Sequence, residues 1–158
     1  ISNQIKPSQA DIEYLALNRE KIDVMTVNDA YHSAKWCDFI YYDDKNWFNA
    51  HRDKLRYHNG VVATIHKTHA DWHFFLRHIS GLSITDNALN MGNGANDQAI
   101  NLALLMRYET IYLFGFKVND KYSHITENLY KFDCTVYNCN TGCSNDLFPR
   151  IEIKEILK

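Results

Sequence analysis

Short apolar runs along the chain mark its expected strands. They are rich in β-branched and aromatic residues and are apolar almost throughout, without a regular alternation of apolar and polar positions. This pattern is typical of strands covered on both faces, as in a parallel sheet. We therefore predict five strands, over residues 22–27, 39–42, 61–65, 111–116 and 135–139.

Segments with helical spacing separate several of these runs. Ser8 and Asp11 form a capping-box pattern in front of an apolar stretch that contains Leu15. Residues 46–57 repeat apolar positions at helical spacing, residues 96–108 form the most apolar helix, and a weaker helix is predicted over residues 126–132. Alternating strands and helices favour a doubly wound α/β fold, here as one domain over residues 1–158.

Composition narrows the class of protein. With 158 residues, of which 46% are hydrophobic and 23% charged, the chain is typical of one globular domain. A formal charge of −2 provides no basic surface, so nucleic acid is not the expected partner. Neither a membrane-spanning run nor a signal-peptide pattern is present, so no membrane partner is expected.

Four cysteines add little chemistry. Cys134, Cys139 and Cys143 are crowded together, but their spacing matches no standard zinc pattern, and Cys37 is remote. We expect reduced structural thiols, which agrees with a cytoplasmic location.

Polar residues follow the predicted strands. Ligands of open parallel sheets bind beyond the carboxyl ends of the strands, although exposed loops carry polar residues in any case. The residues at these ends are Asn28 and Asp29, Asp43 and Asp44, His66 and His69, Lys117, and Asn140.

The stretch "MGNGANDQAINLALLM" joins a glycine-rich turn directly to the most apolar helix. Free N–H groups and the helix dipole suit a phosphate or carboxylate there, with Gly92, Gly94 and Asn96 at the ligand. The stretch is neither GxGxxG nor a Walker loop. The alternative is a plain turn in which Asn96 or Asp97 caps the helix.

A dense group of possible metal ligands lies in "TIHKTHADWHFF". Imidazole nitrogens suit zinc, iron or nickel. A helical segment would bring His66, His69 and His73 to one face, whereas an extended one would bring His69, Asp71 and His73 together. The alternative is an exposed loop that happens to be rich in histidine.

Three further positions carry candidate chemistry, each with a structural alternative. His124 follows a strand and is a candidate general base, or a solvated loop residue. Asp43 and its neighbour Asp44 are candidates for a divalent cation or ribose hydroxyls, or for a capping role. Asn28 is placed to bind a base edge or a sugar, or to close its own turn.

Several segments together resemble a known group of proteins. They are "VNDAYHSAKWCDFIYYDDKNWFNAHRDKL", "QAINLALLMRYETIYLFGF", "SHI" and "LFPRIEI". They resemble Rossmann-like proteins encoded by tailed phages, mostly of unassigned function. That group is similar to the pterin-pyrophosphokinase-like (MptE-like) domain and, remotely, to Campylobacter-type sialyltransferases. The resemblance spans most of the chain, from Pro7 to Ile153.

The resemblance implies a Rossmann-like fold, a mainly parallel sheet flanked by helices, and a nucleotide or nucleotide-sugar ligand. It places Asn28 at the nucleotide, residues 94–96 at the donor and His124 at the catalytic histidine of a glycosyl or related group transferase. The chain departs from the pattern at Lys6, which replaces a glycine of the N-terminal loop, and at Lys117, which replaces an acidic residue. The strand before that loop is missing or degenerate.

These departures favour a second class of function. The alternative is a non-catalytic, degenerate Rossmann module that binds another phage or host protein, forms a homo-oligomer or sequesters a nucleotide signal. A third is a metal-dependent hydrolase built on His66, His69, Asp71 and His73. The expected location is the cytoplasm, that of the host cell for a phage protein.

Overall fold

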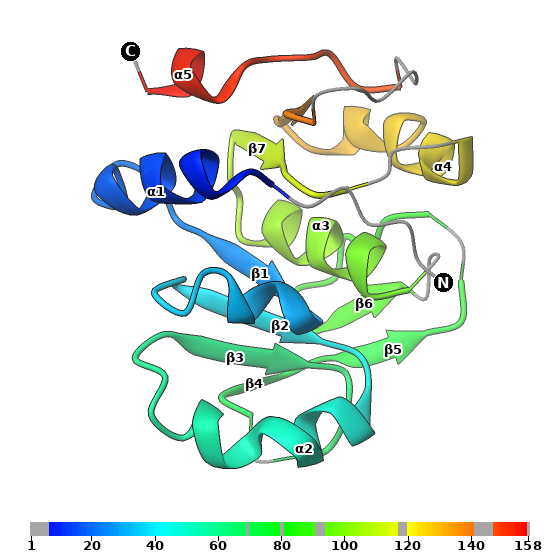
Figure 1. Cartoon of the computed structure of the whole chain (residues 1–158). Coiled ribbons are helices and arrows are strands. Elements are labelled where there is room, and N and C mark those ends of the chain that lie inside the picture. The colour runs from blue at the N-terminus through cyan, green and yellow to red at the C-terminus, as the bar shows by residue number, and fades with distance from the viewer. Residues whose placement is uncertain are drawn as a thin grey trace.

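The computed structural model describes residues 7–68, 70–79, 81–90, 94–116, 120–140 and 147–157 (Figure 1). These residues form a mixed α/β structure in which every strand pairing recorded is parallel. The strands are β1 (Met25–Val27), β2 (Phe39–Tyr42), β3 (Val61–Thr64), β4 (Trp72–His73), β5 (Phe75–Arg77), β6 (Ala88–Asn90), β7 (Thr110–Leu113) and β8 (Thr135–Asn138). The helices are α1 (Gln9–Leu17), α2 (Lys45–Leu55), α3 (Ala95–Leu105), α4 (Ser123–Thr126) and α5 (Ile153–Ile156), with 3-10 turns η1 (Asn28–His32), η2 (Asp120–Tyr122) and η3 (Leu129–Lys131).

The largest sheet is covered on both faces. Its order is β1-β2-β3-β4. Along β2, Ile40 and Tyr42 pack in a cluster with Phe48 of α2, whereas Tyr41 packs with Leu102 of α3 on the opposite face. Because successive strand side chains point to opposite faces, a strand covered on both sides must be apolar at every position. This explains the unbroken "FIYY" run.

The short strands β4 and β5 connect the largest sheet to the β5–β6 pair. Phe74 N–H donates to Thr64 O at 2.8 Å, and Phe75 N–H donates to Asn87 O at 2.9 Å. The extended segment therefore leaves β3 at β4 and continues as β5 beside β6. A third pair, β7 and β8, stands apart in the described chain.

Helix α3 lies between the larger sheet and the β7–β8 pair (Figure 1). Ala99 and Leu102 face the cluster that contains Tyr41, whereas Ile100 and Leu104 pack with the cluster that contains Val136 and Phe148. Few of its side chains reach water, so α3 lacks the polar face of a surface helix.

Asn101 is a polar residue buried in this helix, with 2% of its surface exposed. Its Oδ1 accepts from Ser83 N at 2.8 Å, and its Nδ2 donates to Ser83 O at 3.0 Å. The side chain thus replaces the missing backbone partners of the segment before β6. Nearby, the buried Tyr41 hydroxyl donates to Gln98 Oε1 at 2.7 Å.

The sequence predictions hold for the main elements. All five predicted strands are present, with β1 and β7 shorter than expected, and the capping box of Ser8 and Asp11 is formed. The prediction of one sheet is not borne out, because the described strands fall into three. The helix predicted over 126–132 is instead α4 followed by the turn η3. No strand was predicted over β4, β5 or β6, which are too short to carry an apolar run.

Three of the four cysteines lie in the part of the chain that the structure describes. Cys37, Cys134 and Cys139 carry free thiols, and burial raises the pKa of Cys139 to about 12. Cys143 lies outside the described residues.

In the described ranges, none of the helices has the length and apolar character that a membrane crossing requires.

The Asn101→Ala variant tests the polar contact of α3. The change leaves the N–H and C=O of the buried Ser83 without partners, so we expect the free energy of unfolding to fall by about 2–4 kcal/mol. Urea denaturation measures this loss. Asn49→Ala, on the exposed face of α2, is the matched control and should change stability by less than about 0.5 kcal/mol. Equal effects of the two changes would contradict the assigned role of Asn101.

Candidate functional site

The carboxyl ends of β1, β2 and β3 bring together residues that are distant in sequence. Asn28 follows β1, Asp43 follows β2 and His66 lies just beyond β3. Asn28 Nδ2 donates to Asp43 Oδ1 at 3.4 Å, and His66 Nε2 donates to the Asp43 main-chain oxygen at 2.5 Å. Asp43 is therefore the centre of this edge, held from both neighbouring strands.

Asn28 has an unusual backbone and an unmatched side-chain atom. Its φ of 48° lies in the left-handed region, which asparagine tolerates better than most residues. Its Oδ1 is buried, and among the described residues no donor reaches it. A buried acceptor without a partner is uncommon, and often marks a position that a ligand or water completes.

The amino-terminal end of α3 lies beside Asp43. Gly94 occupies the N-cap with φ of 109°, a conformation that favours glycine. A Cβ at Gly94 would lie 3.8 Å from Asp43 Oδ2, so the turn adjoins the carboxylate. Gly92, the other glycine of the predicted ligand turn, lies outside the described residues.

The plain-cap alternative for this turn does not describe the geometry found. The N-cap is Gly94, which has no side chain to cap the helix. Asn96 instead hydrogen-bonds the Tyr122 hydroxyl, and Asp97 faces His124. The side chains of the first turn of α3 thus bind η2 and α4 rather than their own helix terminus.

Asp97 and His124 form a partly buried ion pair. His124 Nε2 lies 3.0 Å from Asp97 Oδ2, and the two side chains are 21% and 3% exposed. His124 Nδ1 faces the Lys121 carbonyl oxygen at 2.8 Å. Because a carbonyl oxygen can only accept a hydrogen bond, Nδ1 carries a proton, and the buried Nε2 faces the Asp97 carboxylate.

Tyr122 completes this cluster. Burial raises the pKa of its phenol, and the Asp97 charge adds to that effect, while the hydrogen bond with Asn96 opposes it. The phenol therefore stays protonated at neutral pH and acts as a hydrogen-bonding group.

The predicted histidine-rich metal group is dispersed in the part of it that the structure describes. His66 is bound to Asp43 O, and His73 Nε2 lies 3.2 Å from Ile65 O. Asp71 accepts from Val62 N at 2.8 Å at the opposite end of β3. His69 lies outside the described residues. The ligand atoms of His66, Asp71 and His73 do not gather into one group.

Adjacent acidic residues at the strand ends have separate roles. Asp44 is the N-cap of α2, because its side chain accepts from Asn46 N and Trp47 N, whereas Asp43 points to the sheet edge. Asp29 likewise turns away from Asn28 and accepts from Trp47 Nε1 at 2.7 Å. The capping alternative is thus confirmed for Asp44 alone.

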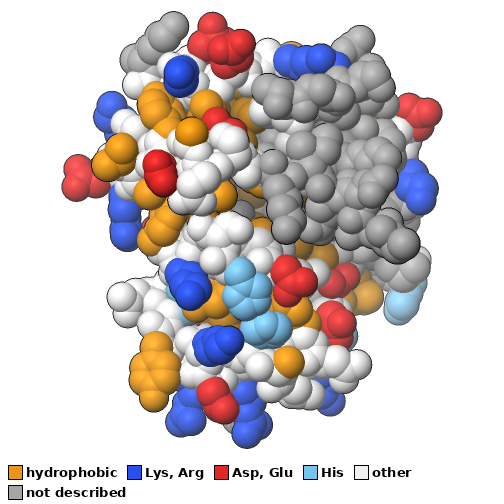
Figure 2. All heavy atoms as spheres, viewed as in Figure 1, with side chains coloured by type: hydrophobic (Ala, Val, Ile, Leu, Met, Phe, Trp, Pro, Cys, Tyr) orange, Lys and Arg blue, Asp and Glu red, His pale blue; other side chains and the backbone are white. Residues whose placement is uncertain are grey.

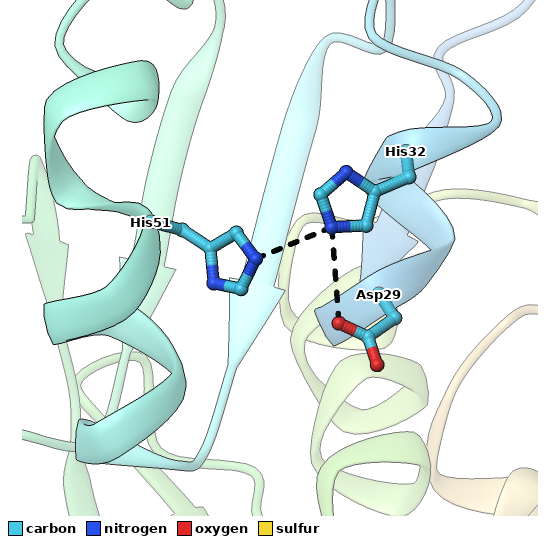
Figure 3. Close-up of side chains that lie close together, drawn as sticks. All are labelled: Asp29, His32 and His51. Atoms are coloured by element: carbon cyan, nitrogen blue, oxygen red, sulfur yellow. Dashed lines mark hydrogen bonds and ion pairs between the residues drawn. The ribbon is translucent and has the colours of Figure 1, made fainter.

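The sequence did not indicate a second group, made of Asp29, His32 and His51 (Figure 3). The available ligand atoms of all three lie within 4.8 Å of one another. His32 lies in η1 and His51 in α2, so only the pairing of β1 with β2 brings them together. The one clue in the sequence is that His32 and His51 each follow a strand of the parallel sheet. The spacing of the two histidines matches no known metal-binding motif.

Two open hollows lie at the other edge of the sheets. One is at the amino ends of β7 and β8, near Glu109 and Cys134, and the other includes Lys35, Lys54 and His58 before β2 and β3. Ligands of parallel sheets bind at the carboxyl edge, so these hollows are not the candidate site.

Comparison of the chain with family models, curated proteins and solved structures finds no match.

Removal of His124 tests the ion pair. His124→Ala removes the imidazole that lies 3.0 Å from the buried carboxylate of Asp97, so we expect a loss of about 2–4 kcal/mol in the free energy of unfolding. The Asp97→Asn and His124→Ala changes should also be non-additive, with a coupling energy of about 1–3 kcal/mol in a double-mutant cycle. Chemical denaturation of the four proteins measures both values. Additive effects would show that the two side chains do not interact.

Proposed function

We propose that this chain is a Rossmann-like protein that binds a nucleotide or nucleotide sugar at the carboxyl edge of β1, β2 and β3. The observation that carries the proposal is the position of Asp43, at the end of the strand beside β1 and next to the amino-terminal end of α3. In dinucleotide-binding folds an acidic side chain near this place binds ribose hydroxyls, and the phosphates lie at a helix N-terminus. The resemblance to phage Rossmann-like proteins agrees with this assignment.

Asp43 and Asn28 provide complementary groups for hydroxyl recognition. A ribose or hexose hydroxyl donates to the Asp43 carboxylate, and the unmatched Asn28 Oδ1 accepts a second donor. Supplying that donor removes the cost of an unpaired buried acceptor, about 1–3 kcal/mol. The sugar is therefore the part of the ligand expected to lie closest to Asp43.

Phosphate is expected further along the first turn of α3. The helix dipole and free N–H groups favour an anion there, but the negative charge of Asp43 next to Gly94 opposes one placed directly against it. We therefore expect a ligand that combines sugar and phosphate to bind better than phosphate alone.

Binding is better supported than group transfer. A general base needs a ring nitrogen free to take a proton from its substrate. Nδ1 of His124 donates to the Lys121 carbonyl oxygen, and Nε2 is buried 3.0 Å from Asp97 Oδ2, so that neither nitrogen is open to a substrate. In this arrangement His124 acts as a positioning residue for the start of α3, which favours the non-catalytic alternative over a transferase with His124 as its base.

A thermal-shift screen of untagged protein tests the proposal. The panel contains adenosine, ribose 5-phosphate, nucleoside mono- and diphosphates, nucleotide sugars and inorganic phosphate. A ligand at about 100 times its dissociation constant adds roughly 2.7 kcal/mol to stability, which raises the Tm by several degrees. We expect such a shift with a nucleotide or nucleotide sugar and none with phosphate alone.

Variants then locate the binding. Asp43→Asn should weaken binding of the best ligand at least about tenfold, since a carboxylate acceptor is lost. Asp53→Asn, which removes a charge from the exposed face of α2, is the matched control and should bind normally. No shift with any compound, or equal binding by both variants, would refute the site.

A further inference from the structure

The group of Asp29, His32 and His51 lies outside the nucleotide site and uses none of its contacts. On the face drawn in Figure 2, histidine side chains reach the surface beside acidic ones. His32 and Asp29 are exposed, with 42% and 75% of their side-chain surfaces accessible, and His51 is half-buried. Asp29 and His32 are therefore accessible to a solute, whereas His51 is partly covered by the protein.

The two imidazoles approach through the same type of nitrogen. His32 Nε2 and His51 Nε2 are 3.2 Å apart (Figure 3). Two nitrogens bound to one tetrahedral zinc ion at about 2.0–2.1 Å are separated by about 3.3 Å. The observed separation is thus close to that of two ligands of one ion.

His51 is held in the form that binds a metal. Its Nδ1 donates to the Trp47 main-chain oxygen at 2.7 Å, so the proton is on Nδ1 and the lone pair is on Nε2. Histidines that bind metals typically donate their other ring nitrogen to a carbonyl or carboxylate in this way. The Trp47 ring also stacks on His51, with centroids 4.5 Å apart, and fixes the plane of the imidazole.

Asp29 is the third member of the group. Its Oδ1 is 4.0 Å from His32 Nε2 and accepts from Trp47 Nε1 at 2.7 Å. Trp47 therefore orients two of the three groups, one through its carbonyl and one through its indole N–H. This is the arrangement of outer residues that holds metal ligands in place.

We propose that Asp29, His32 and His51 bind one divalent transition-metal ion, with zinc as the expected ion and water in the remaining position. Two imidazoles and one carboxylate suit Zn²⁺, Co²⁺ or Ni²⁺, whereas Mg²⁺ and Ca²⁺ prefer sites built from oxygen alone. The ion joins η1 to α2. On binding, the proton of His32 moves to its Nδ1, which points away from the group in Figure 3.

The competing explanation is a simple hydrogen bond from His32 Nε2–H to His51 Nε2. That bond explains the 3.2 Å separation of the two nitrogens. Asp29 takes no part in that hydrogen bond, so loss of its carboxylate would leave the bond between the two histidines unchanged. Metal binding requires all three groups.

Isothermal titration of untagged, chelator-treated protein with ZnCl₂ tests the proposal, with MgCl₂ and CaCl₂ as further titrants. We expect one zinc ion per chain, and no heat from magnesium or calcium at the same concentrations. His32→Gln and Asp29→Asn, both at exposed positions, should each weaken zinc binding at least about tenfold. Trp47→Phe keeps an aromatic ring but removes the indole N–H, and should weaken binding by roughly tenfold.

His73→Gln is the control, because His73 belongs to the other histidine-rich segment and is exposed. It should bind zinc as the unchanged protein does. Quenching of tryptophan fluorescence by Co²⁺ gives a second readout and should be strongly reduced in the Trp47→Phe variant. Absence of stoichiometric binding, loss of binding in His73→Gln alone, or unchanged binding in Asp29→Asn would each overturn the proposal.

Discussion

The burial of helix α3 is the constraint on which the rest of the structure depends. A helix packed on both sides cannot leave polar side chains unpaired, because each unpaired buried group costs about 1–3 kcal/mol. Gln98 meets Tyr41 of β2, Asn101 meets Ser83 ahead of β6, and Asp97 meets His124 of α4. These contacts lead to three different parts of the chain. The helix is thereby held in one position relative to β2, to the segment before β6 and to α4.

This position decides the shape of the carboxyl edge. With α3 fixed, its first turn lies against Asp43, and the positive φ at position 94 favours glycine. The same contacts occupy Asp97 and His124 with each other. His124, which is a candidate general base from the sequence, therefore contacts the first turn of the helix that borders Asp43.

Two adjacent residues at the end of β1, Asn28 and Asp29, belong to two different groups of side chains. The left-handed conformation of Asn28 turns the chain, so that Asn28 faces Asp43 while Asp29 faces Trp47 and His32. Adjacent residues thus contribute to two different groups, one with oxygen and amide atoms suited to hydroxyls and one with imidazoles suited to a metal. The β1–β2 register places both groups within a short stretch of the same edge.

The sequence alone determined the elements that depend on local pattern: the buried parallel strands, the capping box of Ser8 and the polar residues at strand ends. These follow from side-chain period and backbone preference, which neighbouring residues specify. Only the tertiary structure decided which side chains meet. His32 and His51, or Asp97 and His124, are brought together by strand register and helix packing. His66, Asp71 and His73, though close in sequence, are directed to different partners because an extended chain separates them.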